Sequence, residues 1–200
     1  SNPEGMSGKA GIERSADDIF SECQSCRKLF FSGGGVTFTG GEATLSYCEL
    51  LPLLKRLKMS GIHTAIETNA SSVHLLEMSP WIDYLIMDFK HYDSDILKKY
   101  TGIGNEQIKT NFEALTKSGR QLHVRIPLIN GINTQNPYGF AEYFAGQNTA
   151  STVFEFLAYH EYGKEKWTEK YQVQNGFVTE DIIKSFRDAF YAHNLTVVRT

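Results

Sequence analysis

The sequence has few cysteines, no long apolar run and no basic stretch. Its three cysteines, Cys23, Cys26 and Cys48, are an odd number in a chain without an export signal, which favours a reducing cytoplasm. No apolar run approaches about 18 residues, so the sequence predicts no membrane span. A net charge of −3 without a basic run argues against non-specific nucleic-acid binding.

Residues 33–42 read Gly-Gly-Gly-Val-Thr-Phe-Thr-Gly-Gly-Glu, a β-forming run between two glycine clusters. A helical stretch, 45–59, follows them, and junctions of this kind in parallel α/β proteins hold ligands at the carboxyl end of the strand. Gly40 and Gly41 leave the backbone open to a ligand, and Glu42 adds a carboxylate suited to an amine. A tight turn with a solvated glutamate is the alternative. A phosphate loop is excluded, because no Lys-Ser/Thr pair follows the last glycine.

Strands and helices are predicted to alternate along the rest of the chain. Helical signals cover 15–30, 45–59, 73–78, 93–100, 106–117, 138–145 and 180–192, and strand signals cover 36–38, 63–69, 84–90, 122–128, 152–158 and 195–198. We therefore expect one α/β domain over 15–200 with a largely parallel sheet and right-handed crossovers. A closed eight-stranded barrel needs about 250 residues, which favours an incomplete barrel or an open sheet. Residues 1–14 are expected to be poorly ordered.

Charged and polar residues close the predicted strands. Because the carboxyl ends of parallel strands share one edge, these residues are expected to converge. They are Glu42, Glu67-Thr68-Asn69, Asp88, Lys90, Arg125 and His160. This set suits a zwitterionic ligand with hydroxyls, in which Glu42 takes an ammonium, Lys90 or Arg125 a carboxylate, and Asp88 and His160 a sugar diol.

Several of these segments carry a resemblance to a known family. The segments are Gly33 to Ala43, Thr68-Asn69, Met87-Asp88-Phe89-Lys90, Arg125 and Leu157 to Lys164 (Leu-Ala-Tyr-His-Glu-Tyr-Gly-Lys). Together they resemble the glycyl-radical-enzyme activating enzymes, in order from about residue 15 to 198. Those enzymes are radical S-adenosylmethionine (SAM) proteins, and the resemblance implies a partial (β/α)6 TIM-like barrel.

The resemblance also implies roles for individual residues. It assigns SAM binding to Gly40, Gly41, Glu42, Asp88, Phe89, Lys90 and His160. It places a monovalent cation at Glu67, Thr68 and Asp88, with Glu67 standing where the family has Asp. It makes Arg125 a catalytic, active-site cation.

One part of the family pattern is missing from the sequence. The family's CxxxCxxC loop, which holds a 4Fe–4S cluster, should lie before residue 15 and does not occur. Cys23 and Cys26 fall in a predicted helix and Cys48 opens another, so we expect no iron–sulfur ligand in this chain and interpret these thiols as core or surface residues. The simplest account is a fragment that lacks the first strand and the cluster loop, with 1–14 as a remnant of an upstream cluster or ferredoxin-type segment.

The expected function is therefore that of the SAM-binding core of an activating enzyme. In the intact protein, a 4Fe–4S cluster and SAM would generate a glycyl radical on a partner such as pyruvate formate-lyase, with flavodoxin or ferredoxin as electron donor. Two alternatives remain open. One is a radical SAM enzyme that acts on a small molecule, and the other is an inert SAM-binding or interaction module.

Overall fold

The computed structural model describes residues 12–31, 33–161 and 175–198, and its centre is a six-stranded parallel sheet. The strands are β1 (Gly35–Phe38), β2 (His63–Thr68), β3 (Tyr84–Asp88), β4 (Leu122–Leu128), β5 (Thr152–Ala158) and β6 (Thr196–Val197). They lie in sequence order from β1 to β6, and every neighbouring pair is parallel. Within the described residues the sheet does not close, because β1 and β6 are its two edges. The predicted open α/β sheet is confirmed.

Helices connect the strands near the predicted positions. They are α1 (Ala16–Ser25), α2 (Tyr47–Met59), α3 (Leu75–Met78), α4 (Ser94–Thr101), α5 (Glu106–Lys117), α6 (Pro137–Ala145) and α7 (Glu180–Ala192). The first helix is shorter than predicted, since a 3-10 turn, Cys26–Leu29, replaces the end of the predicted stretch 15–30. Another 3-10 turn, Ala43–Ser46, precedes α2. Most of the segment 1–14, expected to be poorly ordered, lies outside the described residues.

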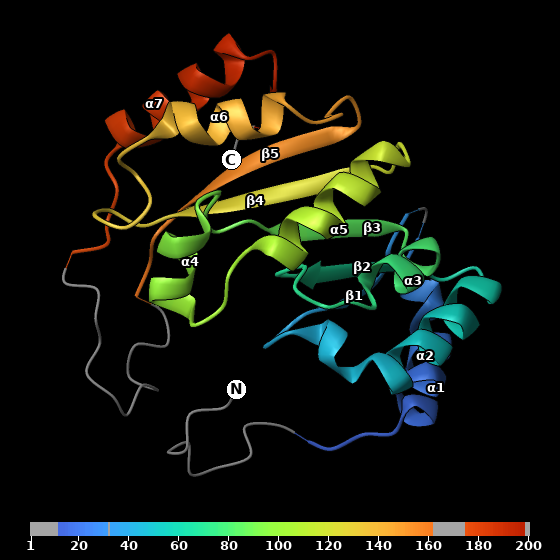
Figure 1. Cartoon of the computed structure of the whole chain (residues 1–200). Helices are drawn as coiled ribbons and strands as arrows, with labels where there is room; N and C mark the ends of the chain where they lie inside the picture. Colours follow the sequence, from blue (N-terminus) through green and yellow to red (C-terminus); the bar gives the residue numbers. More distant parts are fainter. Residues whose placement is uncertain (1–11, 32, 162–174, 199–200) are drawn as a thin grey trace.

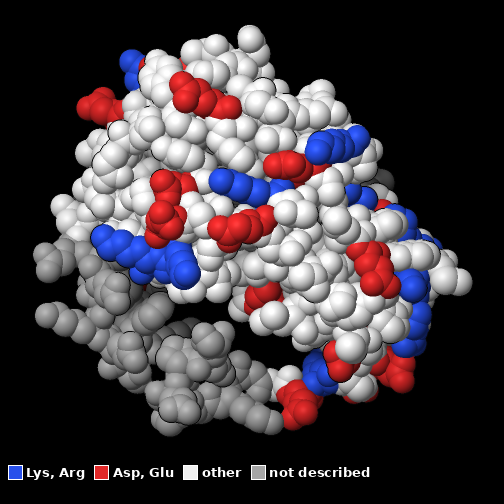
Figure 2. All heavy atoms as spheres, in the orientation of Figure 1, with Lys and Arg blue, Asp and Glu red and all other residues white. Residues whose placement is uncertain are grey.

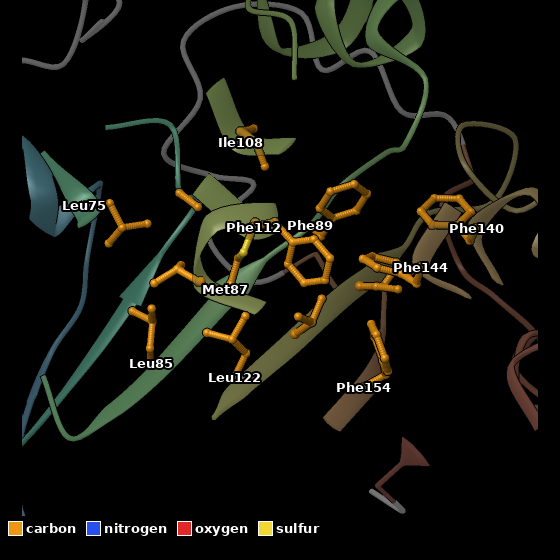
Figure 3. Packing of buried hydrophobic residues seen from close by; sticks show 14 of the residues in the cluster. Leu75, Leu85, Met87, Phe89, Ile108, Phe112, Leu122, Phe140, Phe144 and Phe154 are labelled. Carbon is orange, nitrogen blue, oxygen red and sulfur yellow. The ribbon is translucent and has the colours of Figure 1, made fainter. Parts of the chain in front are cut away.

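The two faces of the sheet differ in what covers them. Side chains alternate between buried and partly exposed along β2, β3, β4 and β5. The buried set packs against the helices, which line up along one side of the sheet (Figure 1). Figure 3 shows this layer, in which Phe112 and Phe144 meet Met87, Phe89 and Phe154. The partly exposed set points to the other side and forms what we call the open face.

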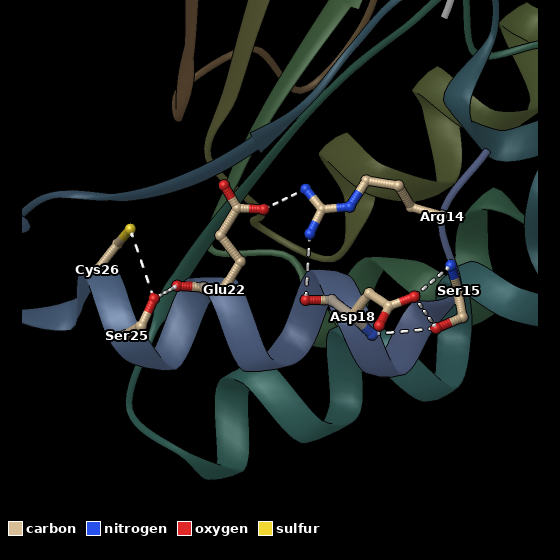
Figure 4. Close-up of polar contacts among 6 residues, drawn as sticks. All are labelled: Arg14, Ser15, Asp18, Glu22, Ser25 and Cys26. Atoms are coloured by element: carbon tan, nitrogen blue, oxygen red, sulfur yellow. Dashed lines mark hydrogen bonds and ion pairs between the residues drawn. The ribbon is translucent and has the colours of Figure 1, made fainter. Parts of the chain in front are cut away.

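The start of α1 shows why the chain begins a helix there. The Oγ of Ser15 accepts a hydrogen bond from the Asp18 N–H at 3.1 Å, and the Asp18 carboxylate accepts one from the Ser15 N–H at 3.2 Å (Figure 4). This reciprocal pair satisfies donors that the first turn of a helix leaves free. Ser15 is therefore the N-cap of α1.

Charges of both signs are mixed over the helix-covered side. Figure 2 shows Lys and Arg interspersed with Asp and Glu over most of this side, with several basic side chains gathered along the right margin of the view. No helix in the described part of the chain is long and apolar enough to cross a membrane.

Candidate ligand site at the carboxyl edge of the sheet

The turn after β1 is built on backbone conformations that glycine adopts readily. Gly40 and Gly41 have φ angles of 90° and 55°, in the left-handed region that strains other residues. A Cβ on either glycine would meet no atom within 4 Å, so conformation and not crowding requires glycine here. The backbone of this turn is therefore open on its outer side to an approaching group.

Glu42 ties this turn to the neighbouring strand. Its Oε1 accepts hydrogen bonds from Thr44 N (3.2 Å), Thr44 Oγ1 (2.5 Å) and Thr68 Oγ1 (2.6 Å). Its Oε2 accepts one from Asn69 N at 2.7 Å. A carboxylate offers about four lone-pair sites, two on each oxygen, so Oε2 retains capacity for one further donor such as a ligand amine.

Three charged residues meet on the open face near the same edge. Arg125 on β4 lies beside Asp88 on β3 in the strand register. Its Nε and Nη2 both donate to Asp88 Oδ1 at 3.0 Å, and Nη2 also donates to Glu67 Oε1 on β2. We call Glu67, Asp88 and Arg125 the rim cluster. Burial raises the pKa of the Asp88 carboxyl, and the Arg125 guanidinium opposes that rise.

The residues after Asp88 alternate in direction. Phe89 is fully buried and packs on Phe144 at 4.8 Å between ring centroids, so only its backbone can meet a ligand at the edge. Lys90 is exposed, and its carbonyl accepts a hydrogen bond from Asn133 Nδ2 at 3.0 Å. The same Nδ2 donates to Pro127 O at 2.7 Å, which links the ends of β3 and β4. Asn133 gave no signal in the sequence, because its role depends on two loops that meet only in the fold.

His160 lies just beyond β5, at the same edge of the parallel sheet as the rim cluster. Its side chain is mostly exposed, and the preceding residue, Tyr159, donates its N–H to Leu128 O at 3.1 Å. The fold thus brings Gly40, Gly41, Glu42, Glu67, Asp88, Lys90, Arg125 and His160 to one edge. Thr68 shares that edge, although its hydroxyl points away from the open face, to Glu42.

A second polar group lies on the open face next to the rim cluster. His123 Nδ1 is 2.8 Å from the Tyr84 hydroxyl, and its Nε2 is 3.0 Å from Glu155 Oε2 without a well-aligned hydrogen bond. Glu155 pairs in register with Arg125, so the group formed by Tyr84, His123 and Glu155 lies next to the rim cluster. Only the strand register, which the sequence does not state, could have linked them.

The three cysteines lie on helical elements, outside the strands of the sheet. Cys23 is buried in a small cluster with Leu53, Leu57 and Ile62, and burial raises the pKa of its thiol. Cys26 ends α1, where its Sγ is 3.9 Å from Ser25 Oγ (Figure 4), and Cys48 is exposed on α2. No group of three or more His, Cys, Asp or Glu suited to a metal occurs in the described ranges.

His91, next to Lys90, makes stability depend on pH. Its ring is buried, its Nδ1 accepts from Asp93 N at 2.8 Å, and burial lowers its pKa below the ordinary value of 6.5. The unfolded chain binds a proton on His91 more readily than the folded chain does, so the stabilising effect of neutral His91 is present above about pH 6.5 and is lost as the pH falls below it.

Between pH 7.5 and pH 5.5, the free energy of unfolding in urea should fall further for the wild type than for His91→Asn, whose Oδ1 can accept the hydrogen bond that Nδ1 accepts. The fall in the free energy of unfolding that is due to His91 should not exceed about 1.4 kcal/mol per pH unit. An equal fall in the two proteins would contradict the role of His91.

The chain matches one family model and several curated proteins. The model described as the radical SAM superfamily matches residues 1–144. The 4-hydroxyphenylacetate decarboxylase activating enzyme of Clostridium scatologenes is 38% identical over 144 residues, which cover 69% of this chain and 46% of that protein. The pyruvate formate-lyase-activating enzyme of Staphylococcus epidermidis is 32% identical over 177 residues, which cover 82% of this chain and 70% of that protein. The chain spans about half the length of most of the curated relatives it matches.

Solved structures share the fold. A domain of a pyruvate-formate lyase-activating enzyme from Bacteroides vulgatus superposes with a TM-score of 0.69 at 25% identity, covering 83% of this chain and 98% of that domain. Streptococcus suis SuiB bound to S-adenosylmethionine gives a TM-score of 0.68 at 13% identity, covering 96% of this chain and 44% of that protein, which shows the fold alone.

Proposed function

Since this chain belongs to the radical SAM superfamily and, within it, to the glycyl-radical-enzyme activating enzymes, we propose that it is the SAM-binding core of such an enzyme. The observation that carries the proposal is the convergence at one sheet edge of an open diglycine turn, a fixed carboxylate and the rim cluster. Three polar groups of SAM are its amine, its carboxylate and its ribose diol. They require a carboxylate, cations and further hydrogen-bonding side chains, and the residues at this edge offer all three.

Each residue at the edge then has one task. The backbone of Gly40 and Gly41 and the Oε2 of Glu42 receive the methionyl amine. Lys90 and Arg125 face the carboxylate, and Asp88 and His160 the ribose. Phe89 can meet the ligand only through its backbone. Because its ring is buried, the side chains of Asp88 and Lys90 point away from the core. SAM bound beside a reduced 4Fe–4S cluster would supply the radical chemistry that removes a hydrogen atom from a glycine Cα of the protein substrate.

The cluster itself does not fit the residues of this chain. A 4Fe–4S cluster is held by thiolates, whereas Cys23 is buried in a helix packing layer and Cys26 and Cys48 lie on separate elements. Under the proposal, those thiolates come from outside these 200 residues. The protein substrate is a glycyl radical enzyme, the electron donor is a flavodoxin or ferredoxin, and the location is the cytoplasm.

Titration calorimetry with SAM tests the proposal. Replacing Lys90 with alanine should weaken binding by about 10- to 150-fold, which corresponds to the 1.5–3 kcal/mol of a hydrogen bond to a charged group. Lys99→Ala on α4 is the matched control, since Lys99 is exposed and belongs to a helix, not to the edge. Unchanged affinity in Lys90→Ala, or no SAM binding by the wild type at millimolar concentration, would refute the site.

A further inference from the structure

The three buried asparagines among the described residues all use their side-chain amide in the same way. Asn105, Asn111 and Asn133 are 1%, 0% and 3% exposed, and the Nδ2 of each donates to two backbone carbonyls. These carbonyls lie at or just past the carboxyl ends of β2, β3 and β4, and they belong to Ala70 and Ser72 for Asn111, to His91 and Tyr92 for Asn105, and to Lys90 and Pro127 for Asn133. Carbonyls that the strand ladder leaves free need another donor, so an amide that bonds two of them fixes the path of the chain there.

Asn133 is held on both sides of its amide. Its Oδ1 accepts a hydrogen bond from Ile129 N at 2.7 Å, and its Nδ2 donates to Lys90 O at 3.0 Å and to Pro127 O at 2.7 Å. Because a backbone N–H can only donate and a carbonyl can only accept, these partners fix which way the amide faces. Asn133 therefore ties the backbone of Lys90 to the end of the neighbouring strand.

Lys90 depends on this contact because it lies past the regular part of the sheet. The register of β3 with β4 ends at Asp88, and one further backbone bond, from Phe89 N to Arg125 O at 2.8 Å, follows. The Lys90 carbonyl is then held by Asn133, while the side chain of Lys90 is exposed. A lysine ammonium sits on a flexible four-carbon stem, so only a fixed backbone can limit where it reaches.

We propose that Asn133 is a positioning residue of the ligand site, which fixes the backbone from which Lys90 reaches a ligand carboxylate. Asn133 itself is buried and acts only through Lys90. The identity of the ligand rests on the proposed function, whereas the hold of Asn133 on the Lys90 backbone does not.

The mobility of the Lys90 backbone tests this hold without SAM. In the wild type, the ¹⁵N order parameter of Lys90 should be about 0.85, the value of rigid backbone, and in Asn133→Ala it should fall toward about 0.6. Asn111→Ala is the matched control, because Asn111 is equally buried and its Nδ2 also holds two carbonyls, after β2. That variant should leave the order parameter of Lys90 unchanged. A flexible Lys90 in the wild type, or a rigid one in Asn133→Ala, would overturn the inference.

A double-mutant cycle on SAM affinity, followed by NMR titration, tests the positioning role itself. Asn133→Ala should weaken SAM binding by about 2- to 12-fold, because the side chain of Lys90 must then be ordered on binding. In a Lys90→Ala background the same substitution should have almost no further effect, since no ammonium is left to position. Asn111→Ala should change the affinity by the same factor in both backgrounds. Equal losses from Asn133→Ala in the two backgrounds would mean that Asn133 serves only the fold, and the inference would be wrong.

Asn133→Asp keeps the test open if Asn133→Ala does not fold. It retains the shape and the acceptor for Ile129 N, but at pH 8 its carboxylate cannot donate to Lys90 O or Pro127 O, so the same two results are expected. If neither variant folds, the wild-type order parameter of Lys90 decides. No SAM binding by the wild type refutes the proposed function, while the order parameters still decide whether Asn133 holds Lys90.

Discussion

Glu42→Ala should reduce the affinity for SAM by more than about 100-fold, the largest effect expected from one substitution at the site. The carboxylate acts twice: Oε2 is the acceptor left for the ligand amine, and the whole group fastens the diglycine turn to β2 through Thr68 and Asn69. Loss of a charged hydrogen bond alone accounts for about 1.5–3 kcal/mol. Loosening of the turn adds the cost of ordering its backbone again on binding. Titration calorimetry measures the total loss of SAM affinity from both effects.

Two further variants separate the two roles of Glu42. Thr68→Val removes one donor that holds the carboxylate and should weaken SAM binding much less than Glu42→Ala, because Oε2 and Asn69 N are untouched. Glu49→Ala, an exposed acid on α2, should leave the affinity unchanged. If Glu42→Ala binds SAM as the wild type does, the carboxylate serves only the fold of the turn and its assignment to the amine is wrong.

The edge of the sheet could be predicted because parallel topology forces it. The apolar run at 84–90 is typical of a strand that is covered on both faces, whereas the described helices line one side of the sheet. The alternation of strands and helices still predicts a parallel sheet, and right-handed crossovers place all carboxyl ends together. Glu42, Asp88, Lys90 and Arg125 needed no further information to be placed at one edge. The glycines at 40 and 41 likewise follow from local chemistry, since the structure gives both a positive φ.

Pairings across the sheet could not be predicted in the same way. Which carboxylate Arg125 meets depends on the register of β3 against β4, and a shift by one residue would turn every side chain to the other face. Register also decides that Glu155 lies beside His123, and loop packing decides that Asn133 reaches Lys90. These contacts join residues that are 32 to 58 positions apart in the sequence, so no local sequence pattern constrains them.

Phe89 shows that strand alternation alone can assign a side chain to the core. Asp88 and Lys90 belong to the site, so the residue between them should face the helices, and its ring is fully buried against Tyr143, Phe144 and Phe112. The resemblance had placed Phe89 among the SAM-binding residues. In the structure its ring meets the core and only its backbone lies at the edge.

Phe89→Ala is therefore expected to lower the free energy of unfolding by about 3–5 kcal/mol, the usual cost of emptying a fully buried phenylalanine position. The cavity lies directly beneath Asp88 and Lys90, so SAM affinity should fall as well, although the ring touches no ligand. Urea unfolding and calorimetry measure the two effects on the same preparation. Phe177→Ala is the control, because Phe177 is 55% exposed and its loss should cost much less. Phe89→Leu should retain most of the stability, since it keeps most of the apolar volume. A loss in Phe89→Ala no greater than that in Phe177→Ala would show that this ring does not support the edge.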